Sequence, residues 1–430
     1  MKNVFQELKL RGFIEQTTHD QELERLLSGE KISSYIGFDP TADSLHVGSL
    51  VPIMAMAHLQ RFSHKTVALV GGGTAMIGDP SGKTELRKML SENEIEHNVN
   101  AIGKQLSQFI SFESEKAILV NNADWLKSLQ YIFFLRDIGR CFSVNRMLKA
   151  ESYRMRLESD EGLNFIEFNY MLLQAYDFYH LYNAQQCVLQ LGGSDQWGNI
   201  VAGIDLIRRK SNAQAYGITF PLITTSSGAK MGKTASGAIW LDKNKTSPYD
   251  YFQYWVNTDD KDVVRFLLLF TFLPVDEIST IRKFEAESLN PVKIILAYET
   301  TKIAHGEKEA SKAYQAAQEM FGLRNISNDL LPSSTIHKQE LLQQSNIPKS
   351  DISLERIEQG VQVFELFNDV GLCESKAAAK RLIKQGGAYM NDLRINDIYM
   401  MVQEESFNDN ELKLRAGKKK YHLVYLQKKI

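Results

Sequence analysis

A short segment after an apolar run contains side chains that could bind the phosphates of a nucleotide. The run SSYIGF at 33–38 leads into a turn and then into His46, Val47, Gly48 and Ser49. The His46 ring can donate a hydrogen bond to a phosphate oxygen, and Gly48 lets a base or ribose approach the backbone. A helix that begins here would also favour an anion at its N-terminus. The alternative is a capped surface helix that carries a chance histidine.

A second glycine-containing segment, residues 78–84, is similar to a P-loop but lacks one of its glycines. Ile77 occupies the position of the first glycine, which excludes a P-loop nucleotidase. The preceding triple glycine fails the dinucleotide-binding pattern, because Met76 stands where the last glycine is required. Lys83 and Arg87 follow at helical spacing and could pair with a leaving pyrophosphate. A glycine-rich surface loop is the alternative.

Two further segments combine glycines with polar or basic side chains. Residues 191–199 (LGGSDQWGN) follow the apolar run CVLQL. Asp195 could accept hydrogen bonds from ribose hydroxyls and Gln196 could reach a carboxylate or a ribose, while the same turn caps the next helix. Lys230 and Lys233 lie in a glycine-flanked segment that could clamp phosphates. A solvated basic loop is the default interpretation of that segment.

One predicted helix carries three polar side chains among apolar neighbours. Tyr170, Gln174 and Asp177 are spaced i, i+4 and i+7, which places them on one helix face. Buried polar groups need partners, and a bound amino acid would supply them. Asp79, at the end of a predicted strand, could hold an ammonium group. An ordinary solvent-exposed face is the alternative.

Short apolar runs that alternate with helical stretches must position these segments. The predicted strands are 33–38, 66–70, 117–120 and 187–191, and one predicted helix is 48–61. This alternation predicts a parallel sheet, whose ligands bind beyond the carboxyl ends of the strands. A helical region follows at 247–322, and the polar stretch 325–351 is typical of a linker.

Composition excludes some classes of protein and separates the tail from the body. The net charge of −2 excludes a uniformly basic nucleic-acid binder. Residues 376–430 contain twelve Lys and Arg against six Asp and Glu, so this tail carries +6 and the rest of the chain −8. A basic tail indicates an anionic partner. The three cysteines form no C-x-x-C pair, no run resembles a signal peptide or a membrane span, and a reducing cytosol is expected.

These motifs together resemble those of class I aminoacyl-tRNA synthetases. The tetrapeptide 46–49 is similar to the HIGH signature, with Ser49 in place of the last histidine, and 230–234 (KMGKT) is similar to the KMSKS signature. The helix at 169–177 resembles the tyrosine-pocket helix of the tyrosyl-tRNA synthetases. The tail segment 373–391 resembles the small RNA-binding fold shared with ribosomal protein S-four. The resemblance extends over nearly the whole chain.

The resemblance implies a role for each matching residue. The residues implied in catalysis are His46, Thr41, Lys83, Arg87, Lys230 and Lys233. Those implied in tyrosine binding are Tyr35, Asp79, Tyr170, Gln174, Asp177 and Gln196. Those implied in ATP binding are Gly37, Asp39, His46, Gly48, Ser49, Gly193, Asp195, Lys230 and Lys233. Those implied in RNA binding are Lys376, Lys380, Arg381, Lys384, Lys418, Lys419 and Lys420. Phenylalanine would leave the phenol-binding pair Tyr35 and Asp177 without its hydroxyl partner, and tyrosyl enzymes are themselves the standard illustration of this discrimination.

The implied fold is α/β, with a parallel-sheet Rossmann-like catalytic domain followed by two smaller domains. The expected parts are the catalytic domain 1–225, a loop and linker 226–246, an α-helical anticodon-binding domain 247–345, and an α+β RNA-binding domain 352–430. The implied substrates are L-tyrosine, ATP with Mg²⁺ and tRNA(Tyr), without a permanently bound metal. The expected assembly is a cytoplasmic homodimer with contacts near Tyr131–Gly162 and no membrane association.

Two alternatives remain open from the sequence. A tryptophanyl-tRNA synthetase shares the catalytic layout but should lack the phenol-binding pair of Tyr35 and Asp177. A catalytically silent RNA-binding relative would not need His46, Lys230 and Lys233, so their retention argues against it.

Overall fold

A computed structural model describes most of the chain as two compact units. The described residues are 3–81, 90–113, 116–160, 162–226, 228, 231–234, 237–284, 286–321, 326–337, 348–391, 393–417 and 420–427. The first unit contains Met1–Tyr314 and Asp329–Ser334, and the second contains Gln315–Asn328 and Thr335–Ile430. The domain boundaries predicted from the sequence stay predictions. No helix in the described ranges is long and apolar enough to cross a membrane.

A six-stranded sheet forms the centre of the first unit. Its strands are β1 (Gln16–Thr17), β2 (Ser33–Phe38), β3 (Lys65–Val70), β4 (Ala117–Asn121), β5 (Cys187–Gly193) and β6 (Tyr216–Phe220), in the order β1-β6-β5-β2-β3-β4. All neighbouring strands are parallel except the edge pair β1 and β6. The four predicted strands and the parallel sheet are therefore confirmed. The prediction was possible because buried parallel strands consist largely of apolar residues.

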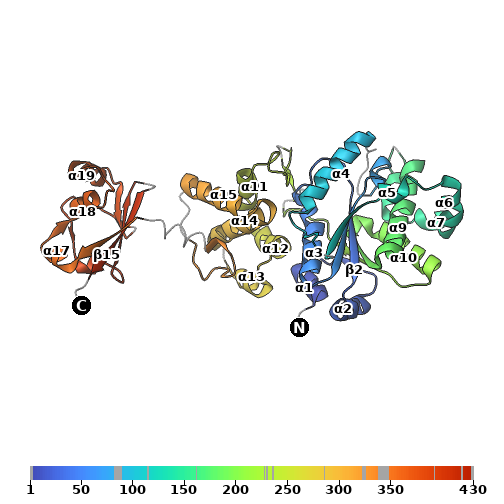
Figure 1. The fold of residues 1–430 in the computed structure, drawn as a ribbon, viewed down its shortest axis with the longest axis horizontal. Coiled ribbons are helices and arrows are strands. Elements are labelled where there is room, and N and C mark those ends of the chain that lie inside the picture. The colour runs from blue at the N-terminus through green and yellow to red at the C-terminus, as the bar shows by residue number, and fades with distance from the viewer. Residues whose placement is uncertain are drawn as a thin grey trace. The chain divides into compact units, whose positions relative to one another are not determined.

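Helices cover both faces of this sheet (Figure 1). On one side lies α3 (Leu50–Arg61), where nine of twelve side chains are buried. On the other side lie α9 (Phe165–Gln185) and α10 (Trp197–Ser211). A capping box of Asn164 and Glu167 starts α9, and Gln186 ends it in the left-handed conformation. The remaining helices of this region are α1 (Val4–Arg11), α2 (Asp20–Gly29), α4 (Glu92–Leu106), α5 (Ala123–Leu126), α6 (Tyr131–Asp137), α7 (Val144–Met147) and α8 (Glu151–Leu157).

A group of helices follows the sheet, as the periodicity predicts. They are α11 (Pro248–Val256), α12 (Asp260–Phe270), α13 (Val275–Ile281), α14 (Asn290–His305) and α15 (Glu307–Phe321). The Ser247 side chain caps α11, and Pro248 occupies the first helical turn, where the missing N–H costs no hydrogen bond. Arg11 joins this group to α1, since its guanidinium donates to the backbone carbonyls of Leu268, Thr271 and Leu273.

The second unit has a separate apolar core beneath a five-stranded sheet. The strands are β9 (Lys349–Ser353), β11 (Ala388–Met390), β12 (Leu393–Arg394), β14 (Glu411–Ala416) and β15 (Lys420–Gln427), in the order β12-β11-β14-β15-β9. The helices are α17 (Leu354–Glu358), α18 (Val363–Asp369) and α19 (Lys376–Lys384), and β10 (Val361–Gln362) pairs with β13 (Met401–Val402). Within the segment 373–391, the structure has the basic helix α19, a turn with Gly386 at φ 73° and the short strand β11.

Candidate active site

The candidate site lies where the chain leaves the carboxyl ends of the central strands. Strands β2 and β5 are neighbours, and the strand order runs outward from them in opposite directions, to β3 and β4 on one side and to β6 on the other. Ligands of open α/β sheets bind at such a switch point. Tyr35 lies on β2, Asp39 follows that strand, and Gln196 lies in the turn after β5. The fold thus brings together residues that are far apart in the sequence.

The Asp177 carboxylate is held by two donors from the segment after β4. Asn122 donates from Nδ2 over 2.9 Å, and Trp125 donates from Nε1 over 2.7 Å. The Trp125 ring stacks on His180 with 4.3 Å between centroids, which fixes the direction of its N–H. Because each donor uses a different oxygen of Asp177, both oxygens keep further acceptor capacity.

Tyr35 completes this part of the site with a hydroxyl that has no partner. Its side chain is only 2% exposed, and the hydroxyl makes no hydrogen bond to any described residue. Burial and the nearby Asp177 charge raise the Tyr35 pKa well above its ordinary value. Burial is also the main cause that raises the Asp177 pKa to about 7, against the lowering effect of Asn122 and Trp125. A buried orphan hydroxyl beside a buried carboxylate is suited to a ligand hydroxyl that donates to one and accepts from the other.

Asp39 connects the predicted phenol-binding pair to the predicted ammonium site. Thr74 donates to its Oδ1 over 2.9 Å, and the Tyr170 hydroxyl donates to its Oδ2 over the same distance. The Asn122 amide donates to Thr74 over 3.0 Å, so one hydrogen-bonded chain joins Asp177, Asn122, Thr74, Asp39 and Tyr170. The structure therefore places Asp39 against residues predicted to bind tyrosine, although the resemblance assigns it to ATP.

A second polar chain surrounds Asp79. The Gln196 amide donates to the Asp79 carboxylate over 2.8 Å, and Asn199 donates to both Gln196 and Gln174. Burial, followed by the Asp39 charge, raises the Asp79 pKa to about 6 despite hydrogen bonds from Ser81 and Gln196. Two carboxyl groups near each other in a buried region are stabilised by a cation, which a substrate ammonium would supply.

The triple glycine after β3 has a structural role that its pattern did not indicate. A Cβ on Gly71 would overlap the Asp39 carboxylate and the Thr74 hydroxyl, and one on Gly72 would overlap the Asn121 amide. The Gly73 N–H donates to Asn122 over 2.7 Å. These glycines allow the polar chain to pass close to the backbone, which agrees with the rejection of a dinucleotide motif.

The His46 turn begins α3 differently from the prediction. The helix starts at Leu50, after a 3₁₀ turn at Val47–Ser49, and not at Gly48. The His46 Nδ1 accepts the Gly48 N–H over 3.0 Å, which caps this turn. In a neutral ring an accepting Nδ1 leaves the proton on Nε2, so Nε2 is the atom that can donate to a ligand.

The lysine-containing segment lies directly on this turn. A Cβ on Gly232 would be 3.1 Å from the Gly48 nitrogen, and one on Gly48 would be 3.2 Å from the Met231 carbonyl oxygen. Ile239 links the two segments, because its N–H donates to Gly232 and its carbonyl accepts from Val47, each over 2.9 Å. The two glycines allow this close contact, and the backbone of Lys233 follows in the short strand β7 (Lys233–Thr234).

Several predicted residues have positions but few contacts in the site. Thr41 is exposed and its N–H donates to the Asp39 carbonyl, while Gly37 is exposed on β2. The Asp195 carboxylate folds back over Gly193, where a Cβ would overlap it, and also accepts from Gln196 over 3.2 Å. The predicted positions that lie outside the described residues or side chains are Lys83, Arg87, Lys230, Lys418, Lys419 and the side chain of Lys233.

The cations predicted to bind RNA differ in their surroundings. Lys376 pairs with Glu365 over 2.6 Å, and Lys380 lies over the Phe364 ring at 4.0 Å. Arg381 and Lys384 are exposed on α19, and Lys420 is exposed at the start of β15. Half of the predicted helix cations are therefore engaged inside the tail.

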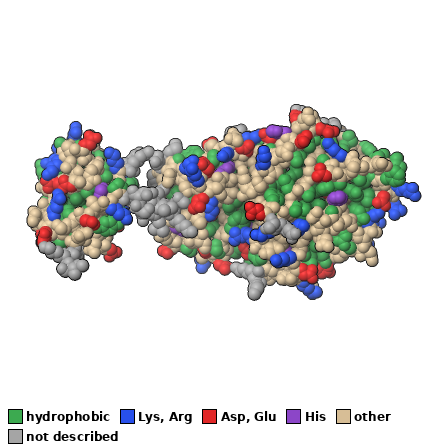
Figure 2. All heavy atoms as spheres, viewed as in Figure 1, with side chains coloured by type: hydrophobic (Ala, Val, Ile, Leu, Met, Phe, Trp, Pro, Cys, Tyr) green, Lys and Arg blue, Asp and Glu red, His purple; other side chains and the backbone are tan. Residues whose placement is uncertain are grey.

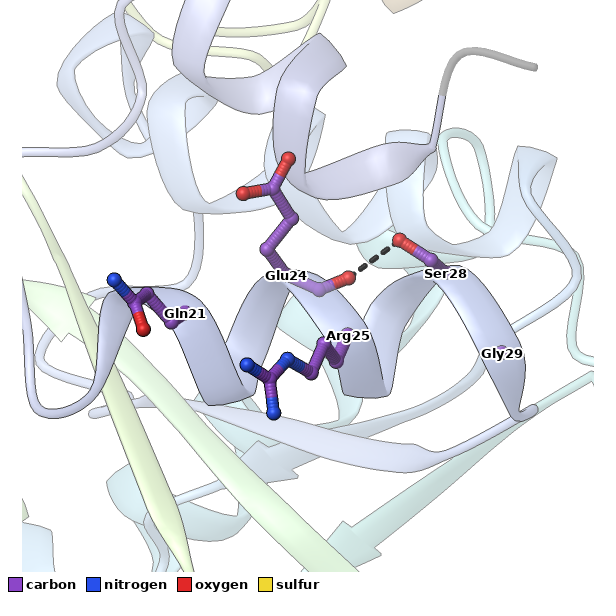
Figure 3. A pocket seen from close by; sticks show the side chains of 5 residues that line it. All are labelled: Gln21, Glu24, Arg25, Ser28 and Gly29. Atoms are coloured by element: carbon purple, nitrogen blue, oxygen red, sulfur yellow. Dashed lines mark hydrogen bonds between the residues drawn. The ribbon is translucent and has the colours of Figure 1, made fainter.

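Hollows and metal ligands elsewhere add little to this site. A shallow hollow of about 430 Å³ lies along α2 between Gln21 and Gly29, where Ser28 donates to the Glu24 carbonyl (Figure 3). It contains none of the predicted site residues. Within the described ranges, no group of three or more His, Cys, Asp and Glu side chains could hold a metal ion. The expectation of no permanently bound metal stays a prediction.

Sequence reasoning missed Asn122, Trp125 and Thr74. The signal was present, because Asn122 and Trp125 directly follow the predicted strand 117–120 at the ligand-binding edge. We expect Asn122→Ala to lower the free energy of unfolding by roughly 1–3 kcal/mol, since a buried carboxylate loses a donor. Tyrosine binding should weaken at the same time. Denaturant unfolding and fluorescence titration measure the two effects.

Asn183→Ala is the matched control for this substitution. The Asn183 amide donates a solvent-exposed hydrogen bond to the Tyr179 carbonyl of the same helix, α9. Equal destabilisation by the two changes, with unaltered tyrosine binding, would mean that Asn122 does not support Asp177.

The fold and the arrangement of the motifs agree with the comparisons to known proteins. A family model described as tRNA synthetases class I (W and Y) matches residues 27–322, and a Tyrosine--tRNA ligase SYY-like C-terminal domain matches residues 341–424. The first match covers more than half of the chain. The parallel sheet, the His46 turn and the glycine-flanked lysine segment therefore belong to a class I tRNA synthetase of the tryptophan and tyrosine group.

Full-length relatives narrow this group. The chain is 60% identical to the Tyrosine--tRNA ligase of Desulfatibacillum aliphaticivorans, with 99% of both chains covered, and 59% identical to that of Desulfosudis oleivorans, with 98% of both covered. It resembles the C-terminally truncated mitochondrial tyrosyl-tRNA synthetase of Aspergillus nidulans, with 31% identity, a TM-score of 0.67, and coverage of 75% of this chain and 95% of that one. The chain belongs to the tyrosine–tRNA ligase family. The tryptophanyl alternative is thereby set aside.

Proposed function

We propose that this protein activates L-tyrosine with ATP to form tyrosyl-adenylate and pyrophosphate, and then transfers tyrosine to the 3′-terminal adenosine of tRNA(Tyr). The observation that carries the proposal is the buried Tyr35 hydroxyl, which has no partner among the described residues and lies beside the Asp177 carboxylate. A phenol hydroxyl would donate to Asp177 and accept from Tyr35. Phenylalanine would bury both groups without that partner, at a cost much larger than that of a lost apolar contact.

The other end of the amino acid would bind the second polar chain. In this proposal the ammonium group contacts Asp79, Tyr170 and Gln174, and Gln196 contacts the carboxylate or the ribose. The support is geometric, because Gln196 already donates to Asp79 and Asn199 orients both Gln174 and Gln196. The buried Asp79 and the partly buried Asp39 also supply the negative charge that an ammonium group requires.

The tyrosine carboxylate is the nucleophile of the first step. Its oxygen forms a bond to the α-phosphorus of ATP, and the bond from that phosphorus to the β-phosphate oxygen breaks. Pyrophosphate leaves, together with the Mg²⁺ that accompanies ATP as substrate. A tRNA terminal hydroxyl then attacks the tyrosyl carbonyl carbon and releases AMP. The protein contributes alignment and donors where negative charge grows.

The phosphate donors in this proposal come from the His46 turn and the cationic segments. His46, with Nε2 as its donor, and Thr41 would contact the phosphates, and Lys83 and Arg87 would contact the leaving pyrophosphate. Lys230 and Lys233 flank the Met231–Gly232 backbone that packs on the His46 turn, which supports a clamp on the same phosphates. Gly37, Asp39, Gly48, Ser49, Gly193 and Asp195 would surround the adenosine and the ribose.

Tyrosine binding should depend on pH through Asp79. Its pKa of about 6 means that the carboxyl group is protonated below that pH and loses its attraction for the ammonium group. The association constant should therefore rise with pH through this step near 6 and through the step near 7 that Asp177 adds, and approach a plateau near pH 8. Titrations between pH 5 and pH 8 measure this.

A ligand without the ammonium group provides the control. Binding of 3-(4-hydroxyphenyl)propionate should lack the step near pH 6 and retain only a step set by Asp177 near pH 7. Identical profiles for the two ligands would mean that Asp79 does not bind the ammonium group.

An exposed apolar surface supports a homodimer. Large apolar side chains are exposed over α6, α7, α8 and the start of α9, and hydrophobic atoms are visible at this end of the first unit (Figure 2). They are Tyr131, Ile132, Phe133, Val144, Met155, Leu157, Phe165 and Ile166. Patches of this kind mark protein interfaces. The surface overlaps the range predicted for dimer contacts, and sedimentation of a dilute sample as a monomer would contradict the proposal.

Two assays on one preparation test the function as a whole. Tyrosine should drive exchange between ATP and pyrophosphate, whereas tryptophan should not, and tRNA should accept tyrosine. Absence of exchange with every amino acid, combined with retained tRNA binding, would favour the catalytically silent relative.

A further inference from the structure

One row of side chains crosses four strands of the tail sheet on the face opposite its core. Arg394 pairs with Tyr389, Tyr389 pairs with Arg415, and Arg415 pairs with Tyr421. Directly paired residues project from the same face of a sheet, so the four side chains form a continuous row. This row is called the Arg–Tyr row.

The sequence neighbours of these residues point into the core. Ala388 and Met390 flank Tyr389, and Leu414 and Ala416 flank Arg415, and all four belong to the buried apolar cluster. Since successive side chains of a strand alternate between its faces, the Arg–Tyr row lies away from that cluster. Its members are exposed or partly exposed, so the row forms part of the tail surface.

Cations and rings within this row are already stacked. The Arg415 guanidinium carbon lies 3.7 Å from the centre of the Tyr389 ring, and Lys413 lies over the Tyr421 ring at 5.5 Å. The Arg415 Nε is buried and makes no hydrogen bond to the described residues. A guanidinium held in this way can offer its terminal N–H groups to a phosphate.

The charge of this surface is uneven. Arg394, Arg415 and Lys413 gather at one end, whereas the acidic residues Glu411 and Asp351 lie farther along the sheet. There the Tyr425 hydroxyl donates to Glu411 over 2.9 Å, so this carboxylate already has a hydrogen-bond partner within the sheet. Two tyrosine rings and three cations therefore lie together at the basic end. The strand-paired positions there carry no carboxylate.

We propose that the Arg–Tyr row binds unpaired nucleotides of an RNA, with bases stacked on the tyrosine and guanidinium planes and phosphates paired with the cations. Flat sheets with exposed rings and nearby cations recognise unstacked bases, whereas duplex RNA hides its base faces. An acidic peptide would use the cations but not the rings. The proposal rests on the proposed function for the identity of the RNA as tRNA, and it names a surface other than the basic face of α19.

The test compares RNA binding by full-length variants. The probe is a fluorescent, non-self-complementary RNA of about twelve nucleotides, within the usual site sizes, and the reference is a duplex of the same length. Tyr421→Leu and Tyr389→Leu should each weaken single-strand binding roughly fivefold or more, while Tyr421→Phe and Tyr389→Phe retain it. Duplex binding should stay unchanged in all four variants.

The salt dependence of RNA affinity distinguishes the contribution of the Arg415 charge from that of the tyrosine rings. Arg415→Gln should reduce the slope of log affinity against log salt by about one, whereas the tyrosine variants leave the slope unchanged. This measurement also serves if a leucine variant fails to fold. Tyr399→Leu is the control, because it removes an exposed ring next to Lys380 of α19 and should not affect binding.

Three results would overturn the proposal. The first is equal affinity for the single strand and the duplex. The second is unchanged single-strand binding in both leucine variants, together with an unchanged salt slope in Arg415→Gln. The third is a loss of binding that occurs only in Tyr399→Leu. Tyrosine-dependent pyrophosphate exchange is measured on the same samples. Pyrophosphate exchange without ring-dependent binding of single-stranded RNA would reject this inference alone. Ring-dependent binding without pyrophosphate exchange would reject the proposed function alone.

Discussion

Lys233→Ala should lower the rate of tyrosyl-adenylate formation by roughly 10²–10³-fold and leave tyrosine affinity nearly unchanged. The backbone next to Lys233 packs on the His46 turn, since Gly232 contacts Gly48 and hydrogen-bonds Ile239. A lysine anchored there would act on charge that develops as pyrophosphate leaves. Its loss should therefore appear in kcat and not in the binding of the free amino acid.

Pre-steady-state formation of tyrosyl-adenylate, measured at several ATP concentrations, tests this prediction. Lys243→Ala is a matched control, because Lys243 is an exposed lysine ten residues farther along the chain. Equal losses in rate and in tyrosine affinity would assign Lys233 to ground-state binding instead.

Removal of the tail should separate the two halves of the reaction. A chain that ends at Ser334 should still form tyrosyl-adenylate within about twofold of the full-length rate, but its charging of tRNA should fall at least about 100-fold, because the +6 tail would no longer contact phosphates. Ser334 is a suitable end, since its hydroxyl donates to the buried Glu299 in the first unit. The C-terminally truncated Aspergillus nidulans relative also matches 75% of this chain.

Single-turnover transfer to tRNA measures the loss, and pyrophosphate exchange by the same preparation shows that the first unit is intact. Normal charging by the shortened chain would remove the tail from the proposed reaction.

Much of the fold could be predicted because local patterns of the amino-acid sequence indicate its main helices and strands. The runs at 33–38, 66–70 and 187–191 are mostly buried strands, as expected of parallel strands covered on both faces, whereas the run at 117–120 is a partly exposed edge strand. Pro248 and Gly386 mark a helix start and a turn through their own backbone preferences. Such signals need no knowledge of distant residues.

The rest depends on contacts that no local pattern contains. Asn122 and Trp125 hold a carboxylate more than fifty residues away, so their role follows only from the packing of α9 against the end of β4. The start of α3 was predicted two residues early, because the His46 ring caps a 3₁₀ turn before the helix. The contacts between cations and tyrosine rings in the tail sheet follow from strand register, which single-strand patterns do not fix.

The buried pair Tyr35 and Asp177 is proposed to select a phenol hydroxyl. The most direct measurement is kcat/KM for pyrophosphate exchange with tyrosine and with phenylalanine, using the unmodified protein. We expect rapid exchange with tyrosine and a loss of several orders of magnitude with phenylalanine, because Tyr35 and Asp177 would then be buried without the ligand hydroxyl. Comparable values for the two amino acids would contradict it.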